Sequence, residues 1–175
     1  MTGVTFTARF EDDELAAGIR RLITLARDPT EITEAIGLLM VQNTERRIDG
    51  PNDANGEPWA PLLPAYAIMK TGPGILRETK TLQRTLTFFA GSGEVIWGSA
   101  QIYAAAQQFG VTIVPKVAPA LSFRLGAPGG GTMWVHRQSV TLPARPYLGI
   151  DEEDQLGIVE IVDRSYERAL YGRAL

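Results

Sequence analysis

The sequence predicts an α+β domain with an N-terminal strand and helical hairpin, a central antiparallel sheet, and a C-terminal helix packed on the sheet. Apolar residues recur at helical spacing only toward the two ends of the chain, and short β-prone runs fill the middle. The length of 175 residues suits one hydrophobic core, so residues 1–175 are expected to form a single domain. Its sections are a strand and helical hairpin (1–49), a long irregular loop (50–74), a β-rich core (75–150) and a helix (151–175).

The N-terminal section predicts one strand and two helices. Residues 4–10 alternate apolar and polar side chains, the period of a half-buried strand. Helical spacing runs from about Asp13 to Arg27. Residues 28–31, Asp-Pro-Thr-Glu, predict an N-cap, a proline at the first helical position and a glutamate that bonds back to the cap. The second helix ends near Ile48, with arginines at 46 and 47 at the negative end of its dipole.

The central section predicts a loop followed by short strands. Residues 49–74 hold five prolines and four glycines around Trp59, whose ring packs either on its own domain or in a pocket of an adjacent subunit. Residues 82–97 predict a β-hairpin, and a short helix follows to about Gln108 with Gly110 as its left-handed stop. Further β-prone runs lie at 113–114, 120–125, 133–136 and 139–142.

The last helix begins near Asp151 and continues through Leu170, with acidic residues at its positive end. Its apolar residues cover more than one narrow stripe. A broad face toward the core and a contact with a second subunit both account for this width.

Composition narrows the function classes. A net charge of -3 and a pI near 5.2 argue against a protein that grips nucleic acid. The absence of cysteine excludes disulfides and thiolate metal sites, and no signal sequence or membrane-spanning run is apparent, so a soluble protein of the host cytoplasm is expected. Charge is uneven: the middle of the chain is basic and both ends are acidic. Solvated helix faces explain this pattern, as does complementarity between neighbouring copies.

No catalytic, cofactor-binding or metal-binding residues are predicted, and the chain is not expected to be an enzyme. His136 is the one histidine, so a Ser-His-Asp relay would have to use it, and its alternation with Trp134 suggests a surface position. Asp53 and Glu57 share a loop and are the remaining candidates for a carboxylate pair. The glycine-rich run at 126–131 precedes no helix that would present amides to a phosphate.

Five short segments carry a resemblance to a known family. They are Pro58–Leu62, Ile75–Thr79, Tyr103–Gly110, Ile113–Lys116 and Pro143–Gly149. In this order they resemble the phage virion morphogenesis family of Mu-like phages. The resemblance implies a structural subunit of the phage neck, a tail completion or tail terminator protein that forms a ring, with six copies as the tail tube's symmetry implies. It also implies location in the virion, with assembly in the host cytoplasm.

The implied partners are the protein itself, the tail tube protein, and head-completion or connector proteins, while DNA passes through without specific binding and no membrane is involved. Arg145 lies between Pro143 and Pro146, which hold the segment extended. Its guanidinium satisfies local carbonyls or carboxylates, or it makes an ion pair between subunits. The candidate interface residues are Trp59, Arg145, Pro146 and Tyr147.

Two other functions stay open at this point. A scaffolding or assembly factor would be absent from the finished virion, whereas a neck protein would be present in it. A cell-wall hydrolase would depend on His136 or on Asp53 and Glu57.

Overall fold

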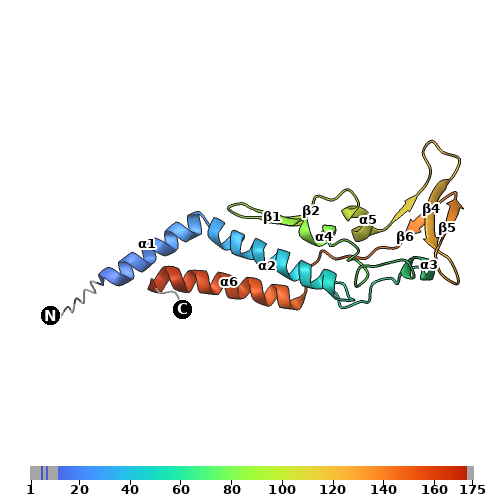
Figure 1. The fold of residues 1–175 in the computed structure, drawn as a ribbon. Coiled ribbons are helices and arrows are strands. Elements are labelled where there is room, and N and C mark those ends of the chain that lie inside the picture. The colour runs from blue at the N-terminus through green and yellow to red at the C-terminus, as the bar shows by residue number, and fades with distance from the viewer. Residues whose placement is uncertain (1–4, 6, 8–11, 173–175) are drawn as a thin grey trace.

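The computed structural model describes Thr5, Thr7 and residues 12–172. The strand predicted at residues 4–10 lies outside these described residues. The subunit is elongated, with three long helices at one end and a β-hairpin at the other (Figure 1). Both described chain ends lie on the helical side (Figure 1). Mixed helices and antiparallel strands confirm the predicted α+β class.

The helical layer contains α1 (Asp13–Arg27), α2 (Thr30–Asp49) and α6 (Glu152–Tyr171). The predicted helical hairpin is wrong, because α1 and α2 meet at an open bend and α6 runs alongside both (Figure 1). Close packing explains the choice of partner: a Cβ added to Gly18 would lie 2.4 Å from the carbonyl oxygen of Leu170. Arg21 also donates to the carbonyls of Ala169 and Leu170, at the negative end of the α6 dipole.

Aspartates start each long helix, although not always as predicted. The Asp12 carboxylate accepts from the Leu15 amide and caps α1. Asp28 accepts from the amide and hydroxyl of Thr30, but Glu31 forms an ion pair with Arg168 of α6 instead of bonding back to the cap. The capping box belongs to α6, where Asp151 and Asp154 accept from each other's backbone amides.

The strands form three separate antiparallel pairs rather than one central sheet. They are β1 (Leu86–Ala90) with β2 (Val95–Ser99), β3 (Val111–Ile113) with β6 (Val140–Leu142), and β4 (Leu121–Gly126) with β5 (Thr132–Arg137). Short helices α3 (Pro64–Ala67), α4 (Thr81–Arg84) and α5 (Ala104–Phe109) connect them.

Helix α2 is the centre of the helical half. The β1–β2 hairpin packs on one side of α2 and α6 packs on another, so the prediction that the C-terminal helix covers a sheet is wrong. Gly37 permits the close approach of the hairpin, since a Cβ there would lie 2.2 Å from the Phe88 ring. The apolar stripe of α6 therefore packs against helices. The sequence pattern of such a stripe is the same whether it packs against a sheet or against helices.

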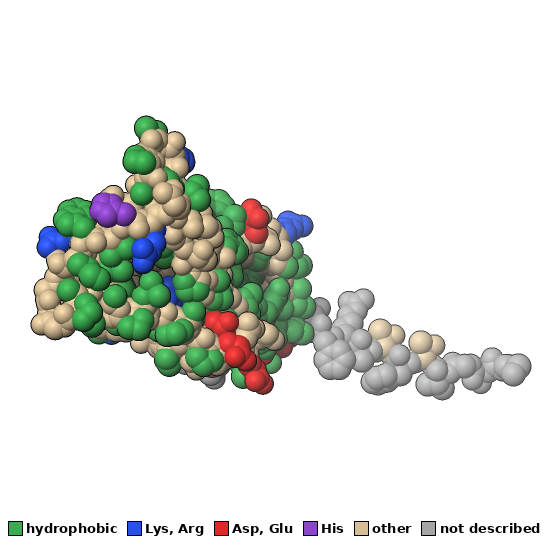
Figure 2. Space-filling view, turned by 90° about the vertical axis from the view of Figure 1, so that its right-hand side faces the viewer, with side chains coloured by type: hydrophobic (Ala, Val, Ile, Leu, Met, Phe, Trp, Pro, Cys, Tyr) green, Lys and Arg blue, Asp and Glu red, His purple; other side chains and the backbone are tan. Residues whose placement is uncertain are grey.

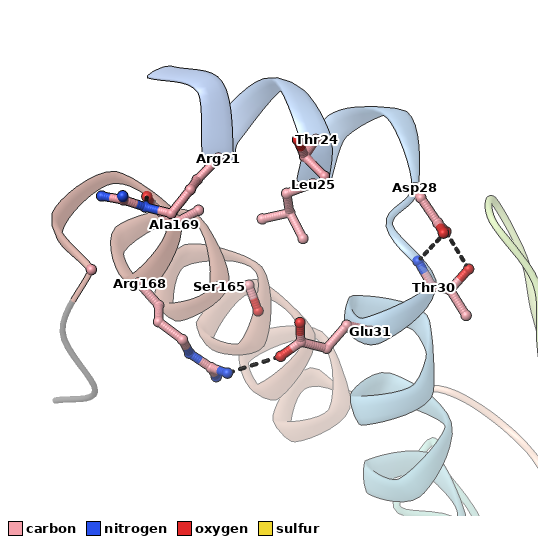
Figure 3. Close-up of a pocket in the computed structure, with 10 residues that line it drawn as sticks. Arg21, Thr24, Leu25, Asp28, Thr30, Glu31, Ser165, Arg168 and Ala169 are labelled. Carbon is pink, nitrogen blue, oxygen red and sulfur yellow. Dashed lines mark hydrogen bonds and ion pairs between the residues drawn. The ribbon is translucent and has the colours of Figure 1, made fainter. Parts of the chain in front are cut away.

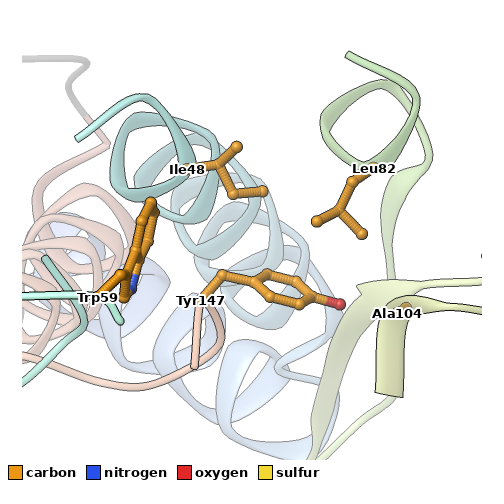
Figure 4. Close-up of a cluster of buried hydrophobic side chains, with 5 residues drawn as sticks. All are labelled: Ile48, Trp59, Leu82, Ala104 and Tyr147. Carbon is orange, nitrogen blue, oxygen red and sulfur yellow. The ribbon is translucent and has the colours of Figure 1, made fainter. Parts of the chain in front are cut away.

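The main core cluster lies where α2, the 50–63 loop, α4, α5 and the segment after β6 meet. Its buried side chains are Ile48, Trp59, Leu82, Ala104 and Tyr147 (Figure 4). Tyr147 is only 1% exposed and its ring lies among the other members of the cluster (Figure 4). This cluster joins segments far apart in the sequence and fixes the chain that leads into α6.

Candidate functional site

The segment between β6 and α6 is held from several sides, beginning at Arg145. The Arg145 amide donates to the Gln107 carbonyl at 2.7 Å, which ties the segment to α5. Its guanidinium donates from Nε to the Ala60 carbonyl at 2.8 Å and from Nη2 to the Pro61 carbonyl at 3.0 Å. Burial lowers the pKa of Arg145, partly opposed by Tyr66. The side chain thus fastens the 50–63 loop to the segment that precedes α6.

Arg47 holds the next part of this segment. Its guanidinium donates to the carbonyls of Tyr147 and Gly149 and forms ion pairs of 2.8 Å with Asp151 and Asp154. Burial works against ionisation of Asp151, but the Asp154 amide and Arg47 outweigh it and lower the pKa of that carboxyl. Asp154 is fully buried. The start of α6 is therefore fixed to the end of α2 by a buried charge network.

An amide pair completes the support. Gln108 of α5 donates to the Leu148 carbonyl at 3.0 Å and accepts from the Leu148 amide at 2.9 Å. Gly110 allows α5 to turn directly into β3, with a φ of 71° and a ψ of 163°. Its positive φ was predicted, but the backbone is extended there rather than closing a left-handed helical stop.

These contacts bring together three of the predicted interface residues. Trp59, Arg145 and Tyr147 are buried within their own subunit, and Pro146 is partly buried. The alternatives left open by the sequence, packing of Trp59 on its own domain and binding of local carbonyls by Arg145, describe the observed contacts. Assignment of the four residues to a subunit interface stays a prediction, and any such role would act by shaping the surface around them.

Four of the five segments that carried the family resemblance therefore meet at one junction, namely 58–62, 75–79, 103–110 and 143–149. The model of the phage virion morphogenesis family matches residues 10–167. The chain belongs to the phage virion morphogenesis family. Neither a curated protein nor a solved structure matches the chain. Family membership indicates a structural or morphogenetic role in building phage particles.

This virion morphogenesis protein exposes far more surface than a compact monomer. A folded chain of 19.1 kDa is expected to expose roughly 8,400 Å². The structure exposes 12,412 Å². The twelve residues outside the description would account for at most about 1,900 Å² even if they were fully extended. The remaining excess, on the order of 2,000 Å², is as large as the area buried at many obligate interfaces.

Much of this surface is apolar. Within the described residues, large apolar side chains are exposed on α1, α2 and α6 and on the strands β1, β2, β3 and β5. Examples from the β half are Phe89, Ile96, Ile102, Phe109, Val117 and Trp134, and examples from the helices are Leu15, Ile19, Leu156, Val159 and Tyr171. Surfaces of this kind are typical of proteins that associate. The candidate functional site of this protein is therefore its exposed apolar surface.

One exposed face lies on the β4–β5 hairpin, at the end of the molecule opposite α1. Cross-strand partners share a face, and the side chains of the pairs Ser122–His136 and Arg124–Trp134 are exposed on it. At the end of β4 the chain meets α3, since a Cβ on Gly126 would lie 2.6 Å from the Ala65 carbonyl oxygen. We define the outer β face as Ser122, Arg124, Thr132, Trp134 and His136, all of which are exposed. Figure 2 looks onto this end and shows the one histidine beside apolar side chains, with the acidic side chains of the view away from it.

The sequence pattern indicated Trp134 only as a residue that alternates with His136, and not as part of an exposed face. A signal for the face was nevertheless present, because residues 95–150 contain no Asp or Glu while they contain Lys116, Arg124, Arg137 and Arg145. The predicted surface position of His136 is confirmed. Only the register of β4 and β5 shows which of these residues share a face with Trp134.

The hydrolase candidates receive no support from their surroundings. Ser122 Oγ and His136 Nδ1 lie 2.8 Å apart, but both are exposed and no acid in residues 95–150 could orient the imidazole. The Asp53 carboxylate accepts from the amides of Asn55 and Glu57 and so stabilises a turn. No group of three or more His, Cys, Asp or Glu side chains that could hold a metal occurs among the described residues. None of the described helices is long and apolar enough to cross a membrane.

A cavity of about 590 Å³ lies where α1, α2 and α6 meet (Figure 3). Its polar groups are engaged within the subunit: Arg168 pairs with Glu31, Asp28 accepts from Thr30, and Arg21 donates to α6 carbonyls (Figure 3). These contacts hold the bend between α1 and α2. The cavity is a joint between helices, and the charged side chains named here are all engaged in contacts within the chain.

Proposed function

We propose that this protein is a structural subunit of the phage neck, a tail completion or tail terminator protein. Copies associate into a ring at the head-proximal end of the tail and form the surface to which the head docks. The observation that carries this proposal is the exposed area, which exceeds that of a compact monomer by an amount typical of obligate interfaces. Family membership supplies the phage context.

The mechanism is mechanical. The buried junction around Arg47, Arg145 and Tyr147 keeps the helical and β halves in a fixed relation. A rigid elongated subunit with different surfaces at its two ends can contact identical neighbours head to tail, and such contacts close into a ring when the rotation between copies allows it. Sixfold closure would match a sixfold tail tube. The remaining surfaces contact the tail tube protein and a head-completion or connector protein, and DNA passes through without specific binding.

The proposal is tested in the phage that encodes the protein. Deleting the gene should leave filled heads and separate tails, and supplying the protein in trans should restore joined particles. In mature virions, mass spectrometry should detect the protein, and an electron cryomicroscopy map should show its density at the junction of head and tail. Joining defects without the protein in purified virions would instead identify an assembly factor and overturn the structural role.

A further inference from the structure

The two ends of the subunit carry surfaces of opposite charge, each centred on exposed apolar side chains. On the outer β face, Trp134 is 67% exposed and is paired across the strands with Arg124. Lys116, Arg124 and Arg137 form no salt bridge in the part of the chain that the structure describes. The outer β face thus presents Trp134 beside Arg124, a cation with no carboxylate partner among the described residues.

The complementary surface lies on α6. Residues at alternating spacings of four and three point away from α1 and α2, and we define the outer α6 face as Glu152, Leu156, Val159, Asp163 and Tyr166. Leu156 is 66% exposed and Val159 is 56% exposed. No salt bridge within the described residues engages Glu152, Asp163 or the neighbouring Glu167. This face has two apolar residues, Leu156 and Val159, between the acidic residues Glu152 and Asp163, and Tyr166 follows.

The inner side of α6 packs against α1 and α2 of the same chain. The outer α6 face stays exposed in the part of the chain that the structure describes. Gly157 lies against Leu39, and Asp154 is buried beside Arg47. The outer β face lies at the far end of the elongated molecule, well separated from α6 (Figure 1). One subunit's two faces therefore cannot meet each other without rearrangement, whereas faces of two different copies can.

We propose that the outer β face of one subunit binds the outer α6 face of the next copy. Trp134 packs against Leu156 and Val159, and Arg124 pairs with one of the two acidic residues of that face, Glu152 or Asp163. Desolvated aromatic anchors flanked by charged residues are the usual energetic centre of such interfaces. Because the two faces differ, the contact is heterologous and propagates from copy to copy until the ring closes. This inference rests on the proposed function and names the surfaces that build the ring.

A photo-crosslinking experiment tests which surfaces meet. The chain has no cysteine, so His136→Cys provides a single attachment point for a benzophenone maleimide on the outer β face. Mixing isotopically light and heavy protein makes adducts between copies recognisable by mass. We expect inter-copy adducts within residues 152–167, and Ser92→Cys in the β1–β2 turn serves as the control that gives none. Adducts of His136→Cys to any other element, or none in an assembled sample, overturn the pairing.

A mixing experiment tests whether the contact is head to tail. One variant combines Arg124→Gln with Trp134→Gln, and the other combines Leu156→Lys with Val159→Lys, all at exposed positions. Each variant alone should have the 19.1 kDa mass of a single chain by light scattering. An equimolar mixture should give a species of twice that mass and nothing larger, because each variant keeps one intact face. Circular dichroism of both variants should match that of the unaltered protein.

The outcomes separate this inference from the proposed function. Rings formed by either variant, or variants that stay monomeric when mixed, overturn the pairing while the unaltered protein's ring supports the neck role. If the outer β face variant assembles normally but loses binding to a fluorescent single-stranded DNA, the face is a DNA contact and the pairing is wrong. If the unaltered protein neither self-associates nor occurs in virions, the proposed function fails as well.

Discussion

Replacing Arg47 with Met should destabilise the subunit strongly, whereas the same change at Arg46 should not. The Arg47 side chain is 6% exposed, and it faces Asp154, which is fully buried. Removing one partner of a buried ion pair typically costs about 3–5 kcal/mol, because the remaining charge has no compensation. Arg46 is 61% exposed and pairs with Glu153, which is 71% exposed, and pairs of this kind contribute about 0–1 kcal/mol.

Urea unfolding followed by circular dichroism measures the difference. With a denaturant slope of about 2 kcal/mol/M, Arg47→Met should lower the midpoint by about 1.5–2.5 M, and Arg46→Met by less than about 0.5 M. All samples are compared at one protein concentration, since self-association adds to apparent stability. Adding Asp154→Asn to Arg47→Met should recover part of the loss by removing the uncompensated charge. Equal midpoints for the two arginine variants would refute the buried network as the anchor of α6.

Three further predictions concern Gly110, Glu78 and the proposed contact between copies. Gly110→Ala should lower stability by about 1–3 kcal/mol in thermal unfolding, because only glycine readily adopts its backbone angles, while Gly93→Ala, with open space around it, should change little. The Lys70 ammonium and the Thr71 amide lower the pKa of Glu78 to about 2 from 4.5. The contribution of Glu78 to stability should therefore be present above pH 4.5 and be lost as the pH falls toward 2. Glu78→Gln should flatten this dependence of stability on pH, and an unchanged profile would contradict the prediction. Raising NaCl from 0.1 to 1 M shortens the Debye length from about 10 to about 3 Å, so the unaltered protein should dissociate measurably in light scattering.

Local signals predicted most of the elements. Turn residues predicted the hairpin β1–β2, β-prone runs predicted the strands β4 and β5, and the acidic start at Asp151 predicted α6. These elements depend on residues that are close in the sequence, so their patterns survive folding. The family resemblance likewise covered the segments that form the core junction, although it did not show that their side chains would be buried.

Pairing between distant elements was beyond the reach of these patterns. The amphipathic stripe on α6 could pack against a sheet or against α1 and α2. Complementary shape selects the helices, as where Gly18 lets α1 approach Leu170 closely. Arg46 and Arg47 looked equivalent at the end of α2, yet a rotation of one residue along the helix places one in water and the other in the interior. The candidate interface residues were predicted from the stiff backbone around them and from their aromatic side chains. Residues buried in the core of one chain have the same properties as residues buried at an interface, so the sequence does not distinguish the two.

The buried polar contacts of this protein are concentrated in one region. Buried hydrogen bonds and ion pairs concentrate at the junction of α2, α5 and the segment before α6, where Arg47, Gln108 and Arg145 bind carbonyls and carboxylates. The outer β face and the outer α6 face have few such contacts and expose apolar side chains instead. A monomeric enzyme needs rigidity around a pocket. A subunit of the proposed ring would need rigidity between its two contact surfaces, because the angle between them determines whether successive copies close. The junction lies between those surfaces, so loosening it should change the number of copies per ring before it abolishes association.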